Sequence, residues 1–330
     1  MSEKRTDISL CRVFATILIL LCHIVKYYTF IPGYQILPQF FNVGVYIFII
    51  ISGYLYGMRK EKKISISLFY QTRLRKIVVP VLIWELVVFW FDKNSGLYNF
   101  VSVLLSVQGA KWISTNIPIV DGGEMMAHTW FVTVILICYL LIPIIKRIPN
   151  TKRCFVNTII IIWSVAIVFS LFSINIFYFI AFITSYFYAG SQLDKRHHNK
   201  INLIIIMFVS VLVRVVGWKL FDNSPFYSFT LVNMTQIILA FSMLVIIKEA
   251  TASNQLFTKI GNSKVIGWLD KNSYYIYIVH YGIIPFIYTN FSLQSASLLF
   301  CLSTFILTII LSKTDRFISY LISNFKSRST

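Results

Sequence analysis

The sequence predicts an all-α fold, a polytopic membrane helical bundle with about ten transmembrane helices, and three observations lead to this class. Hydrophobic residues make up 57% of the 330 residues and charged residues only 13%, whereas a soluble domain carries about a quarter charged residues. The mean hydropathy is +0.75. The apolar residues also form long runs, without the alternating polarity of membrane-barrel strands. This composition excludes ordinary cytosolic enzymes and disordered proteins.

Candidate spans follow from the rule that about 20 helical residues cross a ~30 Å hydrocarbon core. In chain order they are 8–29, 40–58, 77–91, 129–145, 155–173, 176–193, 201–221, 230–247, 273–289 and 295–312. The third run is short by this rule, and only a tight turn near Asn175 divides the fifth from the sixth.

We expect a single domain over residues 1–330. The membrane-spanning bundle is predicted over 8–312, and residues 313–330 are predicted to form a short cytoplasmic tail. The longest predicted loop, 92–128, faces outward and has room for a short amphipathic or re-entrant element.

Basic residues predict the orientation of the bundle. The predicted inner loops hold 24 of the 30 Lys and Arg residues, and such residues are retained on the cytoplasmic side, so both termini are expected there. In a soluble protein the net charge of +18 would suggest a nucleic-acid partner. In a membrane protein the retention of Lys and Arg on the cytoplasmic side explains this charge, so no nucleic acid is expected. The first run lacks a small-x-small cleavage site and contains Arg12, which predicts a retained helix rather than a signal peptide.

Cysteines and standard motifs exclude several kinds of site. The five cysteines are scattered, odd in number and without a CxxC pair, so neither a disulfide framework nor a metal site is expected. No HExxH, GxSxG, Walker or GxGxxG pattern occurs, which leaves metalloproteases, serine hydrolases and nucleotide-binding proteins without support. His197 and His198 belong to a charged loop and are expected to be solvated.

Arg12 and His23 share the first predicted helix and are eleven residues apart. At about 100° and 1.5 Å per residue, both lie on one face, roughly 16 Å apart along the axis. A charge inside a span costs about 2.5–3.5 kcal/mol or more and suggests function. The pair could line a polar passage; alternatively, Arg12 snorkels to the headgroups and His23 makes a contact between helices.

Other polar residues in or beside the spans are further candidates. Glu85 is the one carboxylate clearly inside a predicted span; it could orient His23, pair with Arg12 or Arg214, or hold a proton. Arg214, in the middle of the seventh span, is more typical of a structural partner. Arg73 and Arg75 are predicted to cap the inner end of the third helix, where they either set the topology or bind phosphates.

Two more histidines lie near predicted helices. His128 opens the fourth helix on the outer side, two residues before Trp130, and His280 lies inside the ninth helix. Each alone is more typical of a hydrogen bond within the bundle than of catalysis.

The order of these features resembles the acyltransferase-3 family of membrane proteins that acylate sugars and lipids. The resemblance is carried by Arg12-x10-His23, by 42–48 with 51–54, by Arg73-x-Arg75 with Pro80, by His128-x-Trp130-Phe131 with Tyr139 and Pro143, and by 273–280. No piece is specific alone, but the ordered set covers residues 5–290 on about ten predicted helices.

The resemblance implies transfer of an acyl group, acetyl being favoured, from cytosolic acyl-CoA to a hydroxyl of a cell-surface glycan or glycolipid precursor. His23 would be the general base, Arg12 would hold the CoA or organise the passage, and Glu85 would fix the histidine tautomer. Arg73 and Arg75 would dock the CoA phosphates. Ser52, His128, Trp130 and His280 would support the acceptor side.

The resemblance also implies partners and a location. Acetyl-CoA would be a co-substrate rather than a permanently bound cofactor, and a surface polysaccharide or lipid-linked sugar, such as an O-antigen repeat, would be the acceptor. The protein would lie in the bacterial inner membrane. No residue pattern specifies an oligomeric state.

A transporter or flippase for a glycolipid or small solute is the alternative function, since sparse intramembrane charges suit it equally well. Inverted repeats or paired broken helices would favour transport, and no convincing pair is found. A purely structural membrane scaffold ranks third.

Overall fold

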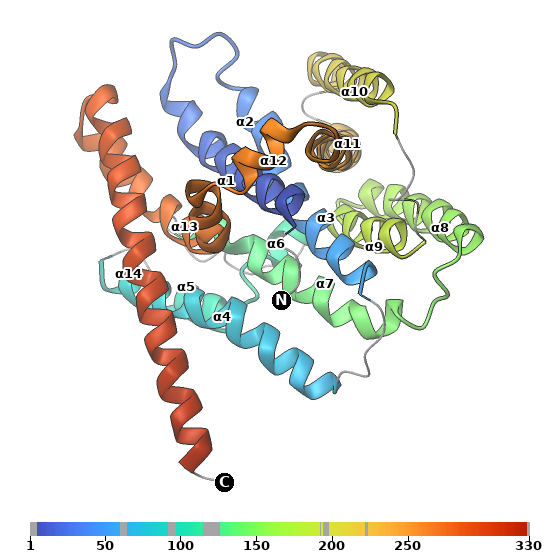
Figure 1. Ribbon diagram of the computed structural model, residues 1–330. Coiled ribbons are helices and arrows are strands. Elements are labelled where there is room, and N and C mark those ends of the chain that lie inside the picture. Colours follow the sequence, from blue (N-terminus) through green and yellow to red (C-terminus); the bar gives the residue numbers. More distant parts are fainter. Residues whose placement is uncertain are drawn as a thin grey trace.

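The computed structural model describes residues 5–59, 65–91, 97–114, 126–191, 193, 198–221 and 224–328. Over these residues the chain is helical and contains no β-strand (Figure 1). The predicted all-α multi-pass fold class is thereby confirmed.

Helices account for most of the described residues. They are α1 (Thr6–Ile24), α2 (Leu37–Phe41), α3 (Val43–Gly57), α4 (Ile66–Phe91), α5 (Leu97–Leu104), α6 (Ala110–Ile113), α7 (Trp130–Ile145), α8 (Lys152–Leu171), α9 (Phe177–Gly190), α10 (Lys200–Phe221), α11 (Val232–Ser253), α12 (Gln255–Gly261), α13 (Lys264–Asn290) and α14 (Leu293–Arg328). Short turns η1 (Val25–Tyr27) and η2 (Ala127–Thr129) and a π-helical turn, η4 (Phe226–Leu231), adjoin α1, α7 and α11.

Among the described residues, seven helical segments are long and apolar enough to cross a membrane. They overlap seven of the predicted spans and are Thr6–Tyr27, Leu37–Gly57, Ala127–Ile145, Lys152–Leu171, Lys200–Phe221, Phe226–Ser253 and Leu293–Ile322. The other three predicted spans lie on α4, α9 and α13. Helix α9 has only 14 residues, whereas α4 and α13 begin well before the predicted spans, in turns that carry polar and charged side chains.

Residues 313–328, predicted to be a tail, continue the last span as part of α14. Nearer the middle of the chain, the predicted 92–128 loop contains two short helices, α5 and α6, in its described part.

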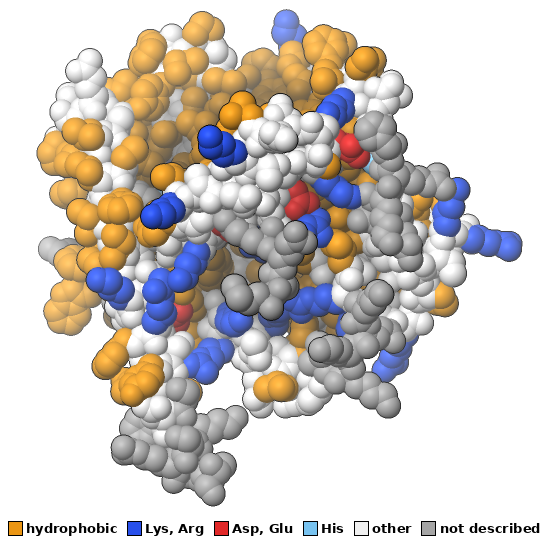
Figure 2. All heavy atoms as spheres, viewed as in Figure 1, with side chains coloured by type: hydrophobic (Ala, Val, Ile, Leu, Met, Phe, Trp, Pro, Cys, Tyr) orange, Lys and Arg blue, Asp and Glu red, His pale blue; other side chains and the backbone are white. Residues whose placement is uncertain are grey.

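Charge and hydrophobicity separate on the molecular surface. Figure 2 shows Lys and Arg side chains gathered on the face near the N-terminus, with hydrophobic side chains toward the periphery. Helices α8 and α10 lie at one edge and α14 along the opposite edge (Figure 1), and α8 and α10 expose large apolar residues such as Ile160 and Phe208. The inner face predicted from the basic loops stays a prediction.

Helix α3 is packed backbone-to-backbone against two neighbours through glycines. A Cβ at Gly53 or Gly57 would lie closer than 3.0 Å to backbone carbonyls of α9, and one at Gly44 would do the same with the Ala15 carbonyl of α1. Gly53 and Gly57 are four residues apart and share a face, while nine residues turn Gly44 about 180° away. Glycine thus lets α1 and α9 approach α3 from opposite sides.

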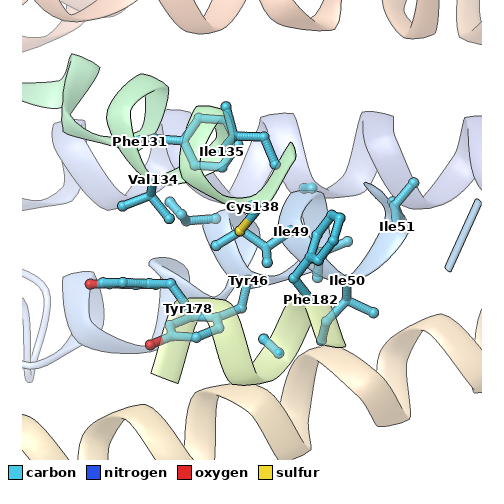
Figure 3. Close-up of a cluster of buried hydrophobic side chains, with 14 of the residues drawn as sticks. Tyr46, Ile49, Ile50, Ile51, Phe131, Val134, Ile135, Cys138, Tyr178 and Phe182 are labelled. Carbon is cyan, nitrogen blue, oxygen red and sulfur yellow. The ribbon is translucent and has the colours of Figure 1, made fainter. Parts of the chain in front are cut away.

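The interior next to this contact is filled by side chains of α3, α7 and α9. Figure 3 shows Tyr46, Phe131 and Phe182 interleaved from these three helices. The rings of Tyr46 and Tyr178 stack with centroids 5.2 Å apart, and the hydroxyl of Tyr46 donates a hydrogen bond to Asn233 of α11. The two aromatic rings therefore join α3 to α9 and, through one polar contact, to α11.

Replacing Gly53 with Leu should destabilise the protein by about 1–3 kcal/mol, because the side chain has no space against α9. Thermal unfolding of the detergent-solubilised protein measures the change. The matched control is Val213→Leu on α10, where the side chain is 42% exposed and the midpoint should stay nearly unchanged. An unaltered midpoint for Gly53→Leu would contradict the close contact of α3 with α9.

Candidate functional site

Helices α1 and α13 run parallel and contact each other at two levels. Arg12 Nη1 lies 3.1 Å from Asp270 Oδ1, and the His23 ring packs edge-on against Tyr281 with centroids 4.7 Å apart. Asp270 and Tyr281 are eleven residues apart, as are Arg12 and His23, so the two helices keep one register over this length. Arg12 and His23 both face α13, as their spacing predicts.

Three histidines from distant parts of the sequence meet in one cluster. The His280 ring centroid is 5.2 Å from that of His23 and 5.2 Å from that of His128. Tyr281 lies flat on His128, with centroids 5.0 Å apart. His128 is 3% exposed and His280 is fully buried. The fold thus brings together α1, the start of α7 and α13, three elements whose histidines the sequence treats as separate candidates.

Backbone carbonyls fix the hydrogen positions of two of these rings. His128 Nε2 is 3.0 Å from the Ile278 carbonyl oxygen, and His280 Nδ1 is 2.7 Å from that of Tyr277. Since a carbonyl only accepts, each of these nitrogens carries the hydrogen. The opposite nitrogens, His128 Nδ1 and His280 Nε2, are buried without a hydrogen-bond partner in the described chain. Such exceptions call for a functional explanation.

A cavity of about 300 Å³ adjoins the cluster. Its walls include His23, His128, Tyr281, Trp112 and Trp130, and its described lining contains no Lys, Arg, Asp or Glu. Within the described part of the chain no hydrogen bond reaches the His23 ring, and this ring lines the cavity. The cavity combines aromatic faces with imidazole nitrogens and suits an uncharged ring that carries hydroxyl groups.

The aromatic wall of the cavity depends on the short helix α6. Trp112 stacks on Trp130 with centroids 5.3 Å apart, and Trp130 packs against Tyr178 of α9. The amide of Gly109 donates to Thr133 Oγ1 at 2.9 Å, and a Cβ at Gly109 would clash with the Trp130 carbonyl. Glycine at this position therefore lets α6 pack against α7 and carry Trp112 to the cavity.

Arg73 and Arg75 lie inside α4, which begins at Ile66, so the prediction that they cap its inner end is wrong. The apolar run that defined the third span starts eleven residues later than the helix does. Arg73 lies over the rings of Tyr56 and Tyr139, 5.2 Å and 5.6 Å from their centroids. Arg75 instead donates to the Ser319 carbonyl of α14. Two residues turn about 200° on a helix, which is why the guanidinium groups point apart.

Glu85 and Arg214 are fully buried, and Ser52 lies within α3. Arg12 pairs with Asp270, and Arg214 contacts the Val232 carbonyl at 3.2 Å and the Phe40 ring. The Ser52 hydroxyl donates to the Phe48 carbonyl one turn earlier, at 2.9 Å. Arg214 is thus held by backbone and aromatic contacts, and its structural role stays a prediction.

His197 and His198 lie between α9 and α10 in the sequence. His198 forms a 2.8 Å hydrogen bond with the Tyr188 hydroxyl, so it is not merely solvated as predicted, while His197 lies outside the described residues. Within the described ranges, no group of three or more His, Cys, Asp or Glu residues is arranged to hold a metal ion.

Sequence reasoning missed Asp270, Trp112 and Tyr281. Asp270 precedes the predicted ninth span, whereas α13 begins at Lys264; the repeated eleven-residue spacing is the signal that could have found it. Trp112 lies in the predicted 92–128 loop, where a re-entrant element was expected but its contact with Trp130 was not.

Comparison with known proteins gives one match. The family model described as an acyltransferase domain, that of the acyltransferase-3 family, matches residues 5–313. No curated protein and no solved structure matches the chain.

The contact between Arg12 and Asp270 should appear as a coupling energy. Arg12→Gln and Asp270→Asn should each destabilise the protein, and the double variant should lose less than the sum, with a coupling of about 0.5–3 kcal/mol. Thermal unfolding in detergent supplies the four values of the cycle. As a control, Asp315, which accepts from the Tyr275 hydroxyl at 2.7 Å, is changed to Asn; this change should be additive with Arg12→Gln. Additivity at Asp270 would mean that the pair contributes nothing.

Proposed function

The chain belongs to the acyltransferase-3 family, and on this premise we propose that it transfers an acyl group, acetyl being favoured, from cytosolic acyl-CoA to a hydroxyl of a cell-surface glycan or glycolipid precursor. The observation that carries the proposal is the cavity in which His23, free of other hydrogen bonds in the described chain, faces an uncharged aromatic wall. The family membership favours acyl transfer over transport.

His23 acts as the general base in this proposal. It takes the proton of the acceptor hydroxyl while that oxygen attacks the carbonyl carbon of the thioester. The carbon–sulfur bond breaks, an ester bond forms, and the proton passes from His23 to the departing thiolate. The reaction consumes one acyl-CoA and one hydroxyl and produces one ester and one CoA thiol.

The donor enters from the face that carries the basic residues (Figure 2). Arg73, held between aromatic rings of α3, α4 and α7, and Arg75 bind the phosphates of CoA. Arg12, roughly 16 Å from His23 along α1, organises the passage through which the thioester arm reaches the base. Its pairing with Asp270 supports this role, because a charge at this depth needs a partner.

The acceptor binds in the cavity. Its uncharged described lining and stacked tryptophans suit a sugar ring, which offers an apolar face to the aromatics and hydroxyl groups to the imidazole nitrogens. A protein that takes its donor from the cytoplasm and modifies a surface-directed acceptor would lie in the bacterial inner membrane, which is the location we propose.

Replacing His23 with Ala should abolish acyl transfer, with a loss of about 10²–10⁴-fold, the contribution of a general base. The measurement is incorporation of labelled acetyl from acetyl-CoA into glycan or glycolipid, in membranes that express either form at equal levels. His198→Gln, a histidine substitution away from the cavity, should retain activity. Substantial transfer by the His23→Ala variant would overturn the base assignment, and no transfer by the unmutated chain would overturn the proposed function.

Replacing Arg73 with Ala should weaken acetyl-CoA binding about 10-fold or more, since hydrogen bonds to charged groups contribute about 1.5–3 kcal/mol. The loss should shrink as salt is raised, because salt screens the phosphate contact. Binding of acetyl-CoA to the purified protein measures both effects, with Arg75→Ala assayed in parallel and the exposed Arg153→Ala on α8 as the charge-matched control. Unchanged affinity of the Arg73 variant for acetyl-CoA would mean that Arg73 sets the membrane topology and does not bind phosphate.

A further inference from the structure

His280 lies behind the two histidines that line the cavity. It is fully buried, its ring is 5.2 Å from each of the other two, and it does not itself line the cavity. The cavity-lining rings that it contacts are those of His23, His128, Tyr277 and Tyr281. Its influence on the chemistry must therefore pass through one of these rings.

The free nitrogen of His280 is a hydrogen-bond acceptor. Its Nδ1 hydrogen is committed to the Tyr277 carbonyl, so the neutral ring presents a lone pair at Nε2. That atom is buried and has no partner among the described residues. A buried acceptor of this kind requires a donor close by.

Of the two neighbouring histidines, only His23 has a hydrogen to give. The His128 hydrogen is on Nε2, where it is donated to the Ile278 carbonyl, and its Nδ1 is a second unpaired acceptor. The His23 ring makes no hydrogen bond within the described chain, and its N–H is therefore uncommitted. The hydrogen-bonding capacities of the cluster pair His23 as donor with His280 as acceptor.

We propose that His280 is a positioning residue for the base, its Nε2 accepting a hydrogen bond from His23; this inference rests on the proposed acyl transfer. With one nitrogen donating to His280, neutral His23 presents the other nitrogen unprotonated to the substrate hydroxyl. When His23 takes the hydroxyl proton, the N–H toward His280 stays bonded and the new N–H delivers its proton to the thiolate. Atoms and charges balance as in the transfer itself.

An imidazole in this position replaces the carboxylate that commonly orients a catalytic histidine. Glu85 was expected to provide that group. A neutral acceptor avoids burying a second charge beside the base, which is unfavourable in an apolar bundle.

Three substitutions at His280 separate the proposed role from an anchoring role. Gln places an acceptor near the Nε2 position, Asn keeps a donor near the Nδ1 position, and Phe keeps the ring without nitrogen. We expect kcat of labelled-acetyl transfer to fall about 100-fold in His280→Phe and His280→Asn, the lower end of a general base's contribution. His280→Gln should remain within about tenfold of wild type. KM for acetyl-CoA and acceptor should change little in all three.

The outcomes distinguish the two proposals. Suppose that wild type transfers acetyl and His23→Ala does not, but His280→Asn retains a higher kcat than His280→Gln. The Nδ1 hydrogen bond to Tyr277 would then be the one that matters, and the inference would be wrong. Equal kcat in wild type and His280→Phe would also overturn it, with thermal unfolding showing that each variant is folded. Activity that persists in His23→Ala would show that His23 is not the base, and this inference would then be wrong as well. No transfer by wild type would overturn the proposed function itself.

Discussion

The close approach of three helices at the glycines of α3 determines where the other elements lie. Between apolar helices in a membrane there is little hydrophobic driving force, so association depends on van der Waals contact at small residues. Gly44 admits α1 on one side, and Gly53 and Gly57 admit α9 on the other. Helix α1 then directs Arg12 and His23 at α13, while α9 supports Trp130 through Tyr178. Both walls of the cavity thus depend on the same helix.

Around this frame, three arginines have defined partners. Arg12 has a carboxylate, Arg214 has a carbonyl and an aromatic ring, and Arg73 has aromatic rings. His128 and His280 are held by backbone carbonyls of α13. Two acceptor nitrogens of the cluster, His128 Nδ1 and His280 Nε2, have no partner among the described residues and lie near a cavity whose described lining is uncharged. Lys and Arg side chains gather on the face seen in Figure 2. The two proposed substrates would thus meet different chemistry, basic side chains for the donor and an uncharged aromatic lining for the acceptor.

Sequence patterns were sufficient for the fold class and for part of the site. Long apolar runs mark the helices because the bilayer requires them, and the eleven-residue spacing places Arg12 and His23 on one face because helical rotation is fixed. Hydropathy could not locate the starts of α4 and α13, since their early turns carry charged side chains. For the same reason it could not predict that Asp270 and Arg73 lie inside these helices. The meeting of His23, His128 and His280 depends on contacts between residues more than 100 positions apart, which no local pattern encodes.

The two contacts between α1 and α13 both form only because the contacting residues have the same spacing in each helix. A single-residue deletion between Arg12 and His23 would shift His23 by about 1.5 Å and turn it by about 100° relative to Arg12. Helix α1 could then keep its contact with Asp270 or its contact with Tyr281, but not both. Only a compensating deletion between Asp270 and Tyr281 would restore both. A length change in one of these segments is therefore tolerated only together with an equal change in the other.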